Sequence, residues 1–136
     1  MRYHAAMGAL ALILFAAPGE AFHGHAPSAS TQSQSRAYAH FLAGYLDYRE
    51  GKLDAALESY QKALKYAGDD PDILYEIGNV QVKKGRLTEA RDALRRALAA
   101  DEGHTRSRYL LAGILAASGE SDRALQEYAR VVKDDP

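Results

Sequence analysis

The feature that most constrains this chain is a short sequence skeleton that returns at a fixed interval. It reads GKLDAALESYQKAL from Gly51, GRLTEARDALRRAL from Gly85 and, more faintly, GESDRALQEYARVV from Gly119, so successive copies begin 34 residues apart. A fixed period of about 20 to 50 residues is typical of supersecondary units that repeat along a chain. The sequence therefore predicts a fold built by repetition of one unit.

Each unit contains two helical patterns separated by a glycine turn. The glycine that opens the skeleton suits the left-handed backbone conformation that ends a helix. Asp54 is predicted to cap the helix that follows, and Thr88 and Asp122 hold the same capping place in the later units. Asp70 and Pro71 supply a cap and a first-turn proline for the helix that opens the second unit.

Small residues are predicted to let the two helices of a unit approach closely, with small facing small, as in Gly78 against Ala90. A large residue at a third place fills the volume that remains. These places hold Gly44, Gly78 and Ala112 on the first helices, Ala56, Ala90 and Ala124 on the second helices, and Tyr60, Leu94 and Tyr128 for the large residue. No single pair buries enough apolar surface, so stability is expected from stacking.

These residues resemble the tetratricopeptide repeat, whose motif favours small residues at its eighth, twentieth and twenty-seventh places and an aromatic residue at its twenty-fourth. The sequence departs from that pattern at the fourth place, where His40, Leu74 and Arg108 replace an aromatic residue, and at Leu94 and Val131. The resemblance implies an all-α fold, a right-handed superhelical solenoid of three helix-turn-helix tetratricopeptide repeats.

The N-terminus has the pattern of a secretory signal peptide. Arg2 is followed by about thirteen apolar residues and then by small residues, with cleavage predicted after Ala21. An uncleaved anchor is the weaker alternative, because a lone helix needs roughly 20 apolar residues to cross a bilayer. The protein is therefore predicted to be exported, to the periplasm or the exterior, with no membrane span after signal cleavage.

Between the signal and the first repeat lies a segment rich in Ser, Gln and His without a sustained apolar period, which predicts a flexible tether. The predicted boundaries are 1–21 for the signal peptide, 22–36 for the tether, and 37–70, 71–104 and 105–136 for the three repeats.

Composition excludes several classes of function. The 17 basic and 18 acidic residues nearly cancel, so nucleic acid and anionic membrane surfaces are poor partners. Because the chain has no cysteine, disulfides, thiol catalysis and cysteine-ligated zinc are excluded.

Residues suited to catalysis or metal binding are few. His23 and His25 could bind copper or nickel near the new N-terminus, but no third ligand is evident and a solvated tail is the favoured alternative. His40 is predicted to pack within a helix pair, and His104 to lie in a loop. The chain is accordingly predicted to be no enzyme, with no cofactor and no metal site.

By the resemblance, the first helices line a concave groove that binds a protein or peptide partner. Its predicted residues are Tyr38, Phe41, Tyr45, Tyr48, Tyr75, Asn79, Arg106 and Tyr109. Phe41, Tyr75 and Tyr109 form an aromatic ladder, and aromatic rings are good anchors for a peptide; the alternative is that these rings are partly core. The family's carboxylate clamp, which grips acidic C-termini of chaperones, needs Lys and Asn where this chain has Phe41, Tyr45 and Glu76, so that activity is not expected.

The last helix is predicted to expose an apolar stripe, because no capping helix is expected after it. Leu125, Tyr128 and Val132 recur at spacings of three and four and form one face. Exposed apolar area of this kind usually marks an interface, here with a partner or a second copy. Asp134 makes the rim more polar and favours the alternative of a tolerated free end.

The function predicted from the sequence is a non-enzymatic binding module of the cell envelope or exterior that holds a partner segment in an aromatic groove. The alternative is a structural subunit of an envelope assembly that self-associates through its C-terminal repeat. Delivery of metal through His23 and His25 is the third hypothesis.

Overall fold

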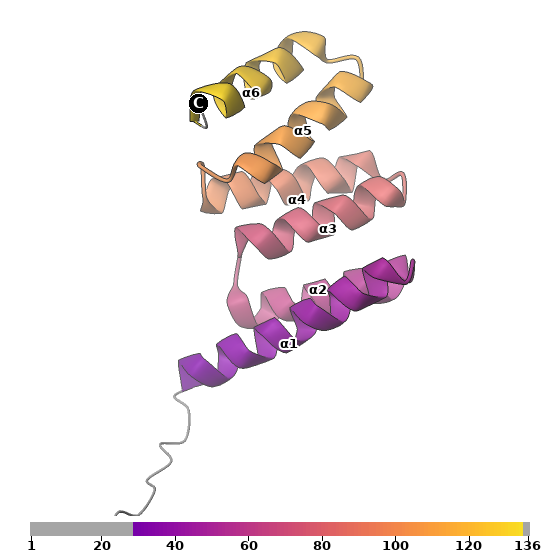
Figure 1. Cartoon of the computed structure of the whole chain (residues 1–136), viewed down its shortest axis with the longest axis vertical. Helices are drawn as coiled ribbons and strands as arrows, with labels where there is room; N and C mark the ends of the chain where they lie inside the picture. Colours follow the sequence, from indigo (N-terminus) through magenta and orange to yellow (C-terminus); the bar gives the residue numbers. More distant parts are fainter. Residues whose placement is uncertain (1–28, 135–136) are drawn as a thin grey trace, which may run out of the picture.

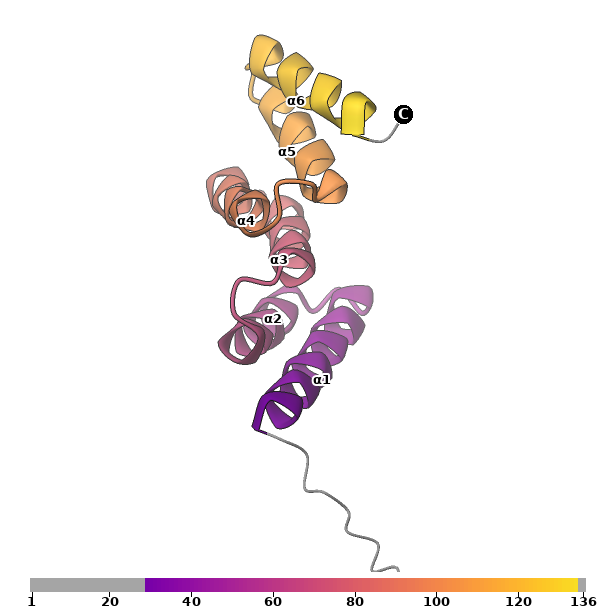
Figure 2. The same cartoon turned by 90° about the vertical axis from the view of Figure 1, so that its left-hand side faces the viewer.

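The computed structural model describes residues 29–134, which form six α-helices and no strand. The helices are α1 (Ala29–Arg49), α2 (Leu53–Ala67), α3 (Pro71–Lys83), α4 (Leu87–Ala100), α5 (Thr105–Ala117) and α6 (Ser121–Asp134). Figure 1 shows them as hairpin pairs stacked in chain order, with α1 and α6 at opposite ends, and Figure 2 shows the same stack from the side. The fold is the predicted all-α helical solenoid.

The local signals at the turns follow the 34-residue period. Gly51, Gly85 and Gly119 have φ angles of 77°, 72° and 79°, so the predicted left-handed turns are confirmed. The carboxylate of Asp70 accepts hydrogen bonds from two backbone N–H groups of the first turn of α3, at 3.0 and 3.1 Å. That cap, which precedes Pro71, is also as predicted.

The predicted caps of the second helices are wrong. Asp54, Thr88 and Asp122 lie inside the first turns of α2, α4 and α6, because these helices begin almost directly after the glycine turn. Lys52 and Arg86 hold the N-cap positions of α2 and α4 and make no side-chain cap hydrogen bond. The carboxylate of Asp54 is directed to the next pair instead, as described below.

The glycines of the first helices admit a large side chain. A Cβ atom on Gly44 would lie 2.8 Å from Cδ1 of Tyr60, and one on Gly78 would lie 3.0 Å from Cδ2 of Leu94. The backbone oxygen of Ala90 is farther from Gly78, at 3.7 Å. Gly78 therefore lies against Ala90 as predicted, but the nearest atoms to both glycines belong to the large residue, Tyr60 or Leu94.

Two apolar clusters lie across the junctions between pairs, so the pairs stabilise one another by stacking. The first joins the first and second pairs and contains Ala56, Tyr60, Ala63, Ile73, Ile77, Val80 and Ala93. The second joins the second and third pairs and contains Ala90, Leu94, Leu111, Ile114, Leu115 and Ala124.

Helix α1 begins earlier than predicted, because residues 29–36 of the expected tether are helical. The hydroxyl of Ser33 donates to the backbone oxygen of Tyr66 at 2.8 Å, and the guanidinium of Arg36 lies 5.7 Å from the centre of the Tyr66 ring. These polar contacts hold the extension against α2 without an apolar period, which is why the sequence pattern did not reveal it.

The predicted signal peptide and the first part of the tether, residues 22–28, lie outside the described residues. Within residues 29–134, no helix combines the length and the apolar character that a bilayer crossing requires.

Candidate functional site

A hollow of about 960 Å³ lies between α1 and α3, beside the end of α2. The extension of α1 contributes to its wall through Ser30, Ser33 and Gln34. Four of the predicted groove residues line it: Tyr38, Phe41, Tyr45 and Arg106. The hollow therefore extends farther on its N-terminal side than the predicted groove, because residues 29–36 are helical rather than the predicted tether.

Two tyrosines of α1 offer ring surface to this hollow. Tyr38 is 69% exposed and Tyr45 is 40% exposed. The guanidinium of Arg49 donates to the hydroxyl of Tyr45 at 3.1 Å, which helps to fix that ring. Phe41 lies deeper, with its ring 5.6 Å from the ring of Tyr60, and packs against the first apolar cluster. The hollow thus has an apolar base and amphipathic rings at its mouth.

The other predicted groove residues do not line the hollow. Tyr48 packs partly against the first cluster, with Nζ of Lys83 lying 4.2 Å from its ring centre. Tyr75 packs partly against the second cluster, and Asn79 donates a long hydrogen bond of 3.4 Å to Glu76. Tyr109 is exposed but contacts α6 rather than the hollow. The predicted ladder is therefore interrupted, because its first two rungs are half-buried.

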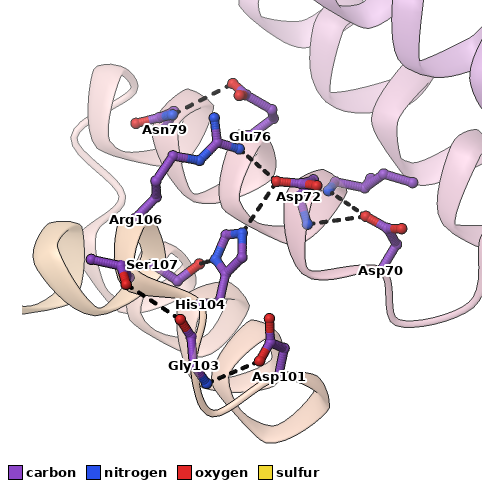
Figure 3. Close-up of polar contacts among 11 residues, drawn as sticks. Asp70, Asp72, Glu76, Asn79, Asp101, Gly103, His104, Arg106 and Ser107 are labelled. Carbon is purple, nitrogen blue, oxygen red and sulfur yellow. Dashed lines mark hydrogen bonds and ion pairs between the residues drawn. The ribbon is translucent and has the colours of Figure 1, made fainter. Parts of the chain in front are cut away.

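A polar network that the sequence reading missed joins the second and third pairs beside the hollow (Figure 3). Asp72 is at its centre and accepts from Nη2 of Arg106 at 2.6 Å, while Nε2 of His104 lies 3.1 Å away. The other ring nitrogen of His104 lies 2.7 Å from the hydroxyl of Ser107. The hydrogen bond with His104 lowers the pKa of Asp72, with Arg106 acting in the same direction and burial opposing it.

One sequence signal could have revealed part of this network. Asp72 and Arg106 stand 34 residues apart and so hold the same place in successive units. Residues at one place of a stacked repeat lie near each other, and opposite charges there predict an ion pair. Arg106 also covers the ring of Tyr75, at 4.5 Å, so it is held on two sides. His104 lies in the loop before α5, as predicted, and its bridging position depends on that turn.

Two departures from the family pattern have structural roles. The rings of His40 and Tyr66 stack in parallel, with centroids 5.7 Å apart, which confirms the prediction that His40 packs. Arg108 is buried, and its Nη1 lies 3.1 Å from Oε2 of Glu127. Arg108 and Glu127 line a second hollow of about 530 Å³ among α4, α5 and α6, where Arg130 also pairs with Glu127.

The three residues of the predicted apolar stripe on α6 differ in exposure. Leu125 is 66% exposed and Val132 is 69% exposed. Tyr128 is half-buried instead: it packs against the second cluster, and the edge of its ring meets the ring of Tyr109 at 5.4 Å. Its inclusion in the exposed stripe is corrected, because its side chain lies between α5 and α6.

Within residues 29–134, no group of three or more His, Cys, Asp or Glu side chains is arranged to hold a metal ion. His23 and His25, the basis of the metal-delivery hypothesis, lie outside the described residues.

Comparison with known proteins identifies a family and one relative. A family model described as tetratricopeptide repeat matches residues 41–105 and 75–136. The cellulose synthase operon protein C of Komagataeibacter xylinus is 42% identical over 79 residues, which is 57% of this chain and 6% of that protein. This chain therefore matches only a small part of that relative's length.

Two solved structures show the same arrangement of helices. The first TPR of Spaghetti (RPAP3), bound to the HSP90 peptide SRMEEVD, has a TM-score of 0.72 and 18% identity, over 76% of this chain and 82% of that one. The TPR2B domain of yeast Sti1, in a pHsp70 complex, has a TM-score of 0.71 and 20% identity, over 74% of this chain and 81% of that one. At these identities the likeness shows the fold.

Proposed function

Because the chain belongs to the tetratricopeptide repeat family, we propose that it is a non-enzymatic protein-interaction module that holds a partner segment in the hollow between α1 and α3. Its proposed place is the cell envelope or the exterior. The signal-like pattern of the N-terminus supports export, and the name of the relative from Komagataeibacter xylinus associates a similar stretch with a cellulose synthase operon.

The observation that carries the proposal is the pair of exposed rings on the hollow. Tyr38 and Tyr45 present apolar faces and hydroxyl groups over a base formed by Phe41 and Ile73. Tyrosines of this kind bury much apolar area on binding and still offer a hydrogen bond, and they are frequent among residues that dominate binding energy. The hollow is at the upper end of the roughly 300–1,000 Å³ typical of ligand sites, which suits a short peptide segment.

The charged side chains that line the hollow indicate which partner peptides should bind to it poorly. Asp70, Asp72 and Glu76 lie on its α3 side, and Arg106, the one Lys or Arg among the described residues that line the hollow, is already paired with Asp72. An acidic peptide would meet three carboxylates and one guanidinium there, and this excess of like charge costs binding energy. Peptides such as SRMEEVD, seen with the Spaghetti domain, are therefore not expected to bind this chain.

The test is photo-crosslinking in cells with a photoreactive amino acid placed at Tyr45, and with Gln61 on the surface of α2 as the matched control position. Tyr45 is expected to yield a defined crosslinked partner, and Gln61 is not. The double change Tyr38→Ala with Tyr45→Ala should reduce binding of that partner by at least about tenfold, since two central anchors are lost. Equal binding by the double variant, with unchanged helicity, would exclude the hollow as the binding surface.

The double variant is preferable to substitution of Tyr75, because Tyr75 packs partly in the second cluster and its loss would also affect stability. The single change Tyr109→Ala then tests whether the binding surface continues to α5, where that ring is exposed.

A second candidate function is self-association as a structural subunit. The observation that favours it is the exposure of Leu125 and Val132 on α6. Contiguous exposed apolar area commonly marks an interface.

A further inference from the structure

The exposed face of α6 has partly buried counterparts within the same molecule. Leu125 and Val132 hold the places of Leu57 and Leu64 in α2, two repeat periods earlier in the sequence. Leu57 and Leu64 pack against the first apolar cluster, to which α3 contributes. In the described fold, the surface that covers such a face is thus the first helix of a following pair.

Helix α1 carries the other half of that contact and also leaves it exposed. Leu46 holds the place of Val80 in α3 and Ile114 in α5, both of which are buried in the clusters shared with the preceding pair. Leu46 itself is 53% exposed, and Leu42, one turn earlier on the helix, is 45% exposed. The face that α3 and α5 bury against a preceding helix is therefore uncovered on α1.

Helices α1 and α6, which carry these two faces, lie at opposite ends of the stack (Figures 1 and 2). We propose that α6 of one copy packs against α1 of a second copy, in the register of the α2–α3 contact. The occupant of each face is thus another molecule of the same chain, and Leu125 and Val132 meet the α1 face that contains Leu46 together with Ala39 and Ala43, which hold the places of Ile73 and Ile77. Such a head-to-tail contact joins two different surfaces, so it continues into stacks rather than closing as a symmetric dimer.

This inference deepens the self-association candidate and does not depend on the hollow. The hollow lies on α1, α3 and the end of α2, and its exposed rings are Tyr38 and Tyr45 rather than the leucines of the end face. Failure of one proposal therefore leaves the other standing.

The polar rim predicts that the contact is weak and can be strengthened. Within the chain, the carboxylate of Asp54 in α2 pairs with Nζ of Lys84, which directly follows α3. The equivalent residues across the proposed contact are Asp122 and Glu50, which have the same sign, although Glu50 is paired with Lys52 at 2.6 Å. Replacement of Glu50 by lysine would recreate the internal ion pair.

The experiment is analytical ultracentrifugation over a wide concentration range. The protein is purified from cells with the N-terminus that it has after any processing there. The wild type should show a weight-average mass that rises with concentration beyond one chain. Leu46→Glu disables the α1 face and Leu125→Glu disables the α6 face, so each variant alone should remain monomeric. Both positions are exposed, so unchanged helicity is the expected control.

Mixing the two variants is the decisive step. The intact α6 face of Leu46→Glu can meet the intact α1 face of Leu125→Glu, so an equimolar mixture should form particles of two chains and no larger ones. Glu50→Lys should tighten the wild-type association by roughly two- to fivefold, because a like-charge contact becomes an exposed ion pair.

Three results would overturn the proposal. The first is association that Leu125→Glu abolishes and Leu46→Glu does not, which would show a symmetric contact between two α6 faces. The second is a mixture of the two variants that stays monomeric while the wild type associates. The third is a monomeric wild type together with a monomeric Glu50→Lys variant, which would show that a second copy does not cover these faces.

Discussion

The first and third helix pairs hold a tyrosine at the same place of the repeat, yet only one of these tyrosines is fully buried. Tyr60 has no exposed surface and lies in the cluster that α3 completes. Tyr128 is half-buried and meets the edge of Tyr109. The pair alone therefore positions the ring, whereas the pair stacked on it removes the ring from water.

The residue opposite the tyrosine adds to this difference. Gly44 leaves the space that the ring of Tyr60 occupies, since a Cβ atom there would lie 2.8 Å from the ring. Ala112 holds the equivalent place in α5 and is itself fully buried. The hydroxyl of Tyr128 lies instead 3.6 Å from where a Cβ atom of Gly113 would stand. The methyl group of Ala112 thus takes the space that Gly44 leaves open, and Tyr128 fits less closely in its pair than Tyr60 does.

The largest effect that should separate the two pairs comes from removing each ring. Tyr60→Ala is expected to cost about 3–5 kcal/mol of unfolding free energy, because it leaves a cavity in a buried cluster. Tyr128→Ala should cost roughly 1–2 kcal/mol, since part of its surface is already in water. Urea denaturation followed by far-UV circular dichroism measures both values. Equal losses would mean that the third pair is as tightly packed as the first.

Adding one methyl group at Gly44 or at Gly113 is expected to change the free energy of unfolding by a smaller amount, with opposite signs at the two positions. Gly44→Ala should destabilise the protein by about 1–2 kcal/mol, because the clash with a buried ring exceeds the gain in helix propensity. Gly113→Ala is the matched control within α5: the new Cβ atom would make an ordinary contact of 3.6 Å. It should stabilise the protein by up to about 1 kcal/mol. Thermal melts of the two variants, compared with wild type, give the signs directly.

If Gly44→Ala instead raised the melting temperature, the ring of Tyr60 would have room to move, and the contrast between the first and third pairs would be smaller than the static distances indicate.

The repeat architecture could be predicted from the sequence because its signals are local. Gly51, Gly85 and Gly119 each need only their own backbone conformation, and Asp70 reaches N–H groups in the next turn. The binding surface depends on contacts between units, which no local pattern specifies. Tyr75 was expected to face the groove, but its burial depends on how closely the third pair approaches.

The N-terminal extension of α1 also depends on a contact that no local sequence pattern specifies. Its helical state depends on Tyr66, more than 30 residues later, which accepts the hydrogen bond of Ser33 and stacks on His40. Without knowledge of the contact with Tyr66, a composition rich in Ser and Gln predicts a flexible tether.

The smallest expected effect concerns the polar link between the second and third pairs. Asp72 and Arg106 form an ion pair there, whereas the same place in the first unit holds Tyr38, so the first junction has no such pair at this position. Surface ion pairs contribute little, and Asp72 is largely exposed, so only a modest effect is expected.

Asp72→Asn should lower the stability of the protein near neutral pH by about 0.5–1 kcal/mol, because it removes the charge that Arg106 and His104 contact. The pKa of Asp72 is lowered in the folded chain, so its contribution is complete above the unfolded value of about 3.9 and is lost as the pH falls through the lower folded pKa. The difference from wild type should therefore shrink in melts below about pH 3.5. Asp92→Asn is the control, since that carboxylate lies 3.9 Å from Arg95 on the surface of α4 and its loss should change stability by no more than about 0.5 kcal/mol. A deficit of Asp72→Asn that stayed constant down to about pH 2.5 would assign the effect to packing or hydrogen bonding at that position rather than to its charge.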